Sequence, residues 1–127
     1  MLANLIQPKV TPFLERLLQN CDDIHAALVV TVDGNMCAMQ QKKDYTLERL
    51  ATMGSSLMSL GDTITAELEM GACNNIISEN EQGIVAFMHI NDKLVLISIT
   101  TRKNALGMLL SHSRICAQNM ALEIGDL

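Results

Sequence analysis

The amino-acid sequence predicts an α+β domain in which a five-stranded antiparallel sheet carries helices on both of its faces. Apolar residues recur at helical spacing near both ends and in the middle of the chain, and short runs rich in Val, Ile and Leu lie between these segments. Short turns join the runs, among them Asp33-Gly34 and Asn91-Asp92. The expected order is helix, hairpin, helix, three-strand meander and helix, in a single domain over residues 1–127.

The first helix is expected to begin at Thr11-Pro12, because threonine is a good N-cap and proline is favoured at the first helical position. Leu14, Leu17 and Cys21 continue it with apolar residues three and four apart. Residues 1–9 form either an extra turn or a loose N-terminal arm, and the sequence leaves both open.

A β-hairpin comes next. Residues 24–32 are rich in Val, Leu and Ala and are short enough for a buried strand. Asp33-Gly34 favours a two-residue hairpin turn, because both central positions of that turn need positive φ. The return strand is expected over residues 35–40.

The three-strand meander is expected over residues 72–79, 83–90 and 93–100. Residues 94–99 are nearly all apolar, which indicates a central strand covered on both faces. The strand 72–79 would then lie at an edge of the sheet. Asn104 is expected to cap the last helix, which places apolar residues along one side.

A long helix lies between the hairpin and the meander, from about Asp44 to Met70, and Gly71 follows its end. At 100° per residue, its most apolar arc is predicted to pack on the sheet. That arc comprises Leu50, Met53, Leu57, Leu60, Ile64 and Leu68.

A second arc of this helix contains Gly54 and Gly61. A glycine inside a helix costs roughly 1 kcal/mol relative to alanine, so we expect another backbone to approach closely here. An edge strand must also be covered or paired, and a two-fold dimer satisfies both requirements. The predicted dimer interface comprises Ala51, Gly54, Met58, Gly61, Thr65, Cys73, Asn75 and Ile77.

The remaining arc is made of neutral hydroxyl residues, where a solvated helix usually carries Lys and Glu. A low-charge outer face is typical of a surface that binds a partner. The alternative is an exposed face without a role. The predicted partner-binding residues are Thr52, Ser55, Ser56, Ser59 and Thr63.

Composition excludes several classes of function. The net charge is -5 and aromatic residues are 2%, so the chain has neither a basic stripe nor rings for base stacking, and no nucleic-acid partner is expected. The same charge disfavours an anionic membrane surface. No apolar run reaches the ~18–20 residues of a membrane span, and residues 1–8 do not resemble a signal peptide, so we expect a cytoplasmic protein.

Catalytic and metal-binding motifs are absent from the sequence: it has no P-loop, GxGxxG, HExxH or GxSxG pattern. The four cysteines lack metal-ligand spacing and are expected to be buried thiols. Arg102 and Lys103 are expected to be solvated charges. We therefore expect no active site, no cofactor and no metal.

The ordered set of local sequences resembles the Roadblock/dynein light chain family. The resemblance rests on AALVVTVDGNMCA (Ala26–Ala38), the long Ser- and Gly-bearing helix, ELEMGACNNIISEN (Glu67–Asn80), INDKLVLISIT (Ile90–Thr100) and the closing amphipathic helix. It extends from about Val10 to Ile124, although no single motif in it is highly specific.

This resemblance implies a Roadblock-like (profilin-like) homodimer with one continuous sheet and two long helices side by side. Members of the family are regulatory platforms for Ras-like small GTPases, and one bacterial member stimulates hydrolysis by a gliding-motility GTPase. By position, the five hydroxyl residues would face the GTPase. No arginine lies among them, so any stimulation of hydrolysis would act by positioning the groups of the GTPase itself.

Four functional hypotheses follow. The first is a dimeric, non-catalytic regulator of a small GTPase, and the second is a structural light chain or scaffold subunit that binds independently of nucleotide. A third is a small-molecule sensor, which the shortage of aromatic residues and the expected dense Leu and Met packing disfavour. A fourth, a metal or redox site, would need two cysteines within bonding geometry.

Overall fold

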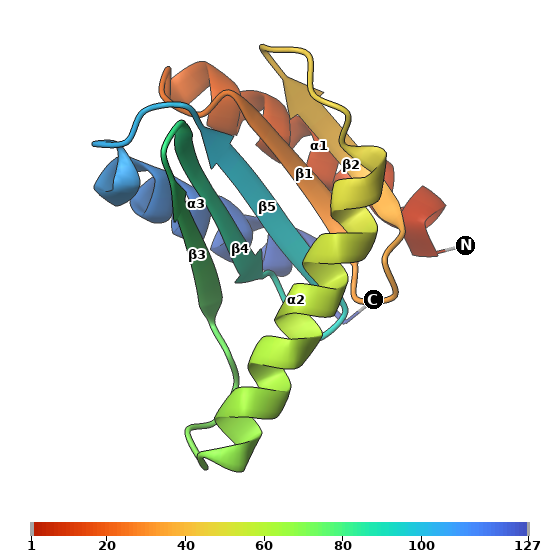
Figure 1. The fold of residues 1–127 in the computed structure, drawn as a ribbon. Helices are drawn as coiled ribbons and strands as arrows, with labels where there is room; N and C mark the ends of the chain where they lie inside the picture. The colour runs from red at the N-terminus through yellow and green to blue at the C-terminus, as the bar shows by residue number, and fades with distance from the viewer. Residues whose placement is uncertain (1, 127) are drawn as a thin grey trace.

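The computed structural model describes residues 2–126, which form three helices and one five-stranded antiparallel sheet (Figure 1). Helices α1 and α3 cover one face of the sheet and α2 crosses the other (Figure 1). The predicted fold class and order of elements are confirmed. The elements are α1 (Leu2–Asn20), β1 (Ala26–Thr31), β2 (Met36–Gln41), α2 (Glu48–Glu67), β3 (Asn75–Asn80), β4 (Gly83–His89), β5 (Leu94–Thr100) and α3 (Leu106–Ile124).

The strand order in the sheet is β2-β1-β5-β4-β3. The apolar strand β5 is central and all of its residues are buried, as its composition predicts, because helices cover both faces above and below it. Strand β3 lies at an edge, and among residues 2–126 it pairs with β4 alone. Its outer row of backbone N–H and C=O groups is therefore free to pair with another strand.

Helix α1 begins at Leu2 instead of Thr11, and both Pro8 and Pro12 lie inside it. The helix continues upstream because Ile6 and Val10 precede Leu14 by eight and four residues and are buried on the same side. Proline has no N–H to donate to the preceding turn. The hydroxyl of Thr11, the residue before Pro12, donates a hydrogen bond to the carbonyl oxygen of Gln7, one turn earlier in the helix, at 2.7 Å.

The core lies in two layers, one on each side of the sheet. The layer under α1 and α3 is the larger, and it buries one pair of hydroxyls. Ser98 on β5 and Ser113 on α3 are both buried, and their Oγ atoms lie 2.7 Å apart. Because each hydroxyl partners the other, neither is left unsatisfied in the core.

The face of α2 that packs on the sheet is not the predicted apolar arc. Its buried residues are Ala51, Gly54, Ser55, Met58 and Gly61. In the predicted arc, the exposed fractions are 54% for Met53, 56% for Leu60, 50% for Ile64 and 57% for Leu68. The prediction of the core face was therefore wrong for these four residues, whereas Leu50 and Leu57 of the same arc are partly buried and pack against the core.

The size of the sheet's side chains explains this orientation. A Cβ atom on Gly54 would lie 2.6 Å from Cδ1 of Ile97, and one on Gly61 would lie 2.8 Å from Cδ1 of Ile76. Large side chains on the strands thus fill the space beneath these two positions of α2, and only glycine fits there. The interpretation of the glycines is corrected accordingly: they make room for the sheet of the same chain, not for a second subunit.

Candidate functional site: the outer surface of α2

An exposed apolar row runs along α2. It is formed by Met53, Leu60, Ile64 and Leu68, seven and four residues apart, so they share one side of the helix. We call these four residues the outer apolar row. A contiguous apolar surface on a small protein usually marks a site that another molecule covers.

The hydroxyl residues lie beside the outer apolar row on α2 and line a groove of about 480 Å³, and Leu60 borders both surfaces. Thr52, Ser56, Ser59 and Thr63 are exposed. Ser55 is the exception: it is buried, and its hydroxyl donates to the carbonyl of Thr52 at 2.9 Å. We call this space the hydroxyl groove; the residues that line it are Val32, Asp33, Thr52, Ser55, Ser56, Ser59, Leu60 and Thr63.

The turn between β1 and β2 forms the opposite wall of the hydroxyl groove. Gly34 in this turn has φ +95, a conformation that side-chain-bearing residues rarely adopt. A Cβ atom on Gly34 would lie 3.2 Å from Oγ of Ser55, so glycine lets the turn approach α2 closely. The predicted Asp33-Gly34 turn therefore has a second role, because it places Asp33 and Val32 at the groove.

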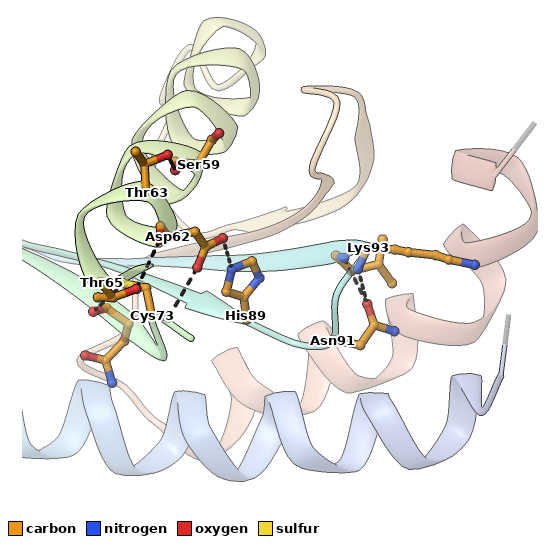
Figure 2. Close-up of polar contacts among 10 residues, drawn as sticks. Ser59, Asp62, Thr63, Thr65, Cys73, His89, Asn91 and Lys93 are labelled. Atoms are coloured by element: carbon orange, nitrogen blue, oxygen red, sulfur yellow. Dashed lines mark hydrogen bonds and ion pairs between the residues drawn. The ribbon is translucent and has the colours of Figure 1, made fainter. Parts of the chain in front are cut away.

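A polar cluster adjoins the hydroxyl groove (Figure 2). Asp62 on α2 places Oδ2 3.1 Å from Nε2 of His89 on β4, and its Oδ1 accepts the backbone N–H of Cys73 at 3.2 Å. One carboxylate thus ties α2 both to β4 and to the segment that leads into β3. A small cleft of about 260 Å³ connects this cluster with the groove, since Ser55, Ser59, Asp62 and His89 all line it.

The cluster does not have the features of a nucleophilic site. Burial, followed by the nearby charge of Asp62, raises the pKa of the Cys73 thiol, which disfavours the reactive thiolate. Burial also raises the pKa of Cys37 and of Cys116 to about 11. All four cysteines are buried and free, as predicted. Within residues 2–126, no three His, Cys, Asp or Glu side chains gather as metal ligands.

The predicted dimer residues divide into two groups. Ala51, Gly54, Met58 and Gly61 are covered by the sheet of their own chain and are removed from the interface. Thr65, Cys73, Asn75 and Ile77 lie at the far end of α2 and along the edge strand; of these Cys73 is buried and the others are partly buried. Arg102, expected to be solvated, lies 3.1 Å from Asp23 and is more than half exposed.

Sequence reasoning missed Val32, Asp33, Asp62 and His89 as residues of this surface. Asp62 carried a usable signal, because it is the only acidic residue of α2 between its first and last turns. The Asp62 side chain is 43% exposed, and a carboxylate that is partly covered usually accepts a hydrogen bond. The partner itself, His89, is 27 residues away and only the tertiary structure brings it close.

Comparisons with solved structures confirm the fold. The chain matches the gliding protein MglB from Thermus thermophilus with a TM-score of 0.83 and 16% identity, over 93% of this chain and 90% of that one. A structure described as MglB with a tetrameric arrangement matches with a TM-score of 0.83 and 17% identity, over 93% and 89%. A profilin from Schizosaccharomyces pombe matches with a TM-score of 0.66 and 9% identity, over 91% and 98%.

No helix within residues 2–126 is both long and apolar enough to cross a membrane. None of the proteins with curated descriptions matches the chain in sequence. A family model described as the Roadblock/LC7 domain matches residues 12–100, which is more than half of the chain. The protein therefore belongs to the Roadblock/LC7 domain family.

Proposed function

We propose that this protein is a dimeric, non-catalytic regulator that binds a Ras-like small GTPase in the cytoplasm through the outer surface of α2. The observation that carries the proposal is the arrangement of α2 itself. One exposed side is apolar and the other forms a low-charge groove, so the helix offers two surfaces of different chemistry. Membership of the Roadblock/LC7 family and the structural likeness to MglB support the same function.

The apolar side is suited to self-association. The outer apolar row would pack against its copy, while the free edge of β3 would pair with the β3 of the second subunit. Such an interface would bury the outer apolar row and pair the free edge of β3 at the same time. This interface differs from the one expected from the sequence. The outer apolar row takes the place of the buried residues Ala51, Gly54, Met58 and Gly61, and the edge strand β3 remains part of the interface.

The hydroxyl groove is suited to the GTPase. Hydroxyls can donate and accept hydrogen bonds, and they lose less hydration energy than charges when a partner covers them. Arginine and lysine are missing from the residues that line the groove. We therefore propose that any stimulation of GTP hydrolysis acts by ordering the catalytic groups of the GTPase, without a donated arginine.

The test is capture of partners from a lysate of the host on immobilised protein, in parallel with a non-hydrolysable GTP analogue and with GDP. Wild type is compared with Ser59→Arg, which places a bulky charge in the groove, and with Ser111→Arg. Ser111 is the matched control, since it is an exposed helical serine on α3, on the other face of the sheet. Mass spectrometry identifies the bound proteins.

We expect wild type and Ser111→Arg to enrich a small GTPase only with the GTP analogue, and Ser59→Arg to lose at least tenfold of that enrichment. The same three proteins are then assayed for their effect on GTP hydrolysis by the purified GTPase. Enrichment that ignores the nucleotide would instead support the scaffold or light-chain alternative. Capture of a GTPase by Ser59→Arg at the wild-type level would remove the hydroxyl groove from the proposal.

A further inference from the structure

A second groove lies on the other face of the sheet, between the edge of the sheet and α3. Its volume is about 900 Å³. Asn75 on β3 and Met88 on β4 are paired across the strands and form one wall with Ile90. The facing wall is α3, which presents Arg114, Gln118 and Leu122. We call this space the α3 groove, and none of its residues belongs to the hydroxyl groove.

Two alanines explain why the α3 groove is open. Ala117 and Ala121 are one helical turn apart and both line it. A larger residue at either position would fill the space between α3 and the sheet. The groove is therefore opened by the packing of α3, and Asn74 and Ile90, which flank the strands, complete its lining.

The groove combines an apolar wall with one cation. Met88, Ile90 and the two alanines are apolar, and Leu122 at the rim is 82% exposed. Arg114 is the one lysine or arginine in the lining, and the groove has no Asp or Glu. Within the described part of the chain, Arg114 forms no ion pair. Met88, Ile90 and Ala117 are almost fully buried, so the apolar surface open to a ligand comes mainly from Ala121 and Leu122. In a protein of net charge -5, an arginine without an ion pair beside this surface favours a ligand with a carboxylate.

The shape of the groove favours a peptide segment over a small molecule. From Arg114 to Leu122 the wall runs along eight residues of α3, or about 12 Å at 1.5 Å per residue. This length matches about four residues of extended chain. With its rim leucine this exposed, the groove would leave a small ligand largely in water, whereas ligand pockets usually enclose most of the ligand surface.

We propose that the α3 groove docks a short apolar segment of a partner protein whose single carboxylate pairs with Arg114. The segment lays apolar side chains against Ala121 and Leu122, and the amides of Asn75 and Gln118 border its path. This surface goes beyond the proposed GTPase contact, because it lies on the opposite face of the sheet from α2. One molecule can therefore hold the segment while the hydroxyl groove is occupied.

The experiment is selection of a random peptide library displayed on phage against the full-length protein. Wild type is compared with Arg114→Glu, which reverses the charge in the groove, and with Arg49→Glu. Arg49 is an exposed arginine on α2 and lies outside the groove, so it controls for net charge. Selected peptides are then synthesised, and their affinities are measured by calorimetry.

We expect wild type and Arg49→Glu to select peptides with one Asp or Glu among apolar residues. Arg114→Glu should bind those peptides at least tenfold more weakly and should itself select Lys or Arg. Leu122→Asp should weaken binding several-fold, whereas Leu5→Asp should not; both leucines are exposed, so neither change disturbs the core. Failure to enrich any sequence, or equal binding by wild type and Arg114→Glu, would overturn the proposal.

Two further measurements distinguish the peptide proposal from a small-ligand site and from the proposed GTPase contact. Sodium octanoate is a free apolar carboxylate, and if it bound as tightly as the selected peptides, the groove would be a small-ligand site and the peptide proposal would fail. Ser59→Arg should bind the peptides as wild type does, and Arg114→Glu should capture the GTPase as wild type does. Failure of one function is therefore distinguishable from failure of the other.

Discussion

At Gly83 the backbone adopts φ +151, and a Cβ atom there would overlap the carbonyl oxygen of Thr100 on the neighbouring strand. The residue opens β4 opposite the end of β5, so both the dihedral angle and the close contact require glycine. Neither requirement involves a flexible side chain that could move away. This position is therefore among the least tolerant of substitution in the fold.

Gly83→Ala is predicted to lower the free energy of unfolding by about 3 kcal/mol, because backbone strain and a clash with a backbone atom add together. Urea denaturation followed by circular dichroism measures the change. Gly107→Ala is the control: it lies in the first turn of α3 with open space around its Cβ, and it should raise stability by about 0.5–1 kcal/mol. Equal stability of Gly83→Ala and wild type would show that the strand accommodates alanine.

At the scale of the element, α2 is amphipathic in the opposite sense to a helix of an isolated monomer. Apart from Met58, the residues buried against the sheet are small, and four large apolar residues, Met53, Leu60, Ile64 and Leu68, are at least half exposed. Such an arrangement leaves apolar surface uncovered, and burying about 25 cal/mol per Å² of it favours association. The wall of the hydroxyl groove, the tie from Asp62 to His89 and the outer apolar row all lie on this one helix.

The double variant Leu60→Asp/Ile64→Asp is predicted to be a folded monomer, whereas wild type is predicted to be a dimer. Light scattering coupled to gel filtration should show half the wild-type mass, with a circular dichroism spectrum unchanged, since both side chains are already at least half exposed in one chain. The matched control is Ile115→Asp, an exposed isoleucine on α3, which should leave the mass as in wild type. A wild-type mass for the double variant would refute the proposed interface.

At the scale of the whole molecule, one end of the sheet is joined by polar contacts from several elements. Nδ1 of His25, before β1, accepts the backbone N–H of Thr101, after β5, at 3.0 Å. Lys43, after β2, donates to the hydroxyl of the same Thr101 at 3.1 Å. Burial first, then the charges of Lys43 and Lys42, lower the pKa of His25 below 6.5, so the neutral ring that accepts this hydrogen bond is favoured.

Stability is predicted to fall as the pH decreases below about 6.5. In that range the unfolded chain binds a proton at His25 and the folded protein, with its lowered pKa, resists doing so, which shifts the equilibrium toward unfolding. His25→Asn removes the titration and keeps an acceptor for Thr101. Urea denaturation at pH 7.5, 6.5 and 5.5 should therefore show a smaller loss in the variant; an equal loss would assign the pH dependence to other groups.

Local patterns in the sequence were enough to predict the elements that depend on neighbouring residues. The central position of the apolar strand β5 and the edge position of β3 follow from composition, and the structure has both. A turn does lie at Asp33-Gly34, but the predicted two-residue geometry was wrong: only Gly34 has positive φ, and β1 and β2 end and begin at Thr31 and Met36. The hydroxyl residues of α2 were also recognised in the sequence, and the structure adds that four of the five are exposed at one groove.

The tertiary structure alone decided which side of α2 faces the sheet. Helical periodicity identifies an apolar arc, but it does not reveal that Ile97 and Ile76 already fill the space beneath the helix. The pairing of Asp62 with His89 and the opening of the α3 groove likewise depend on residues that are far apart along the chain. The sequence by itself determined the elements and their order, because these depend on local propensity. Only the tertiary structure determined which side of each element faces the core, because packing depends on the volume of side chains that are distant in the sequence.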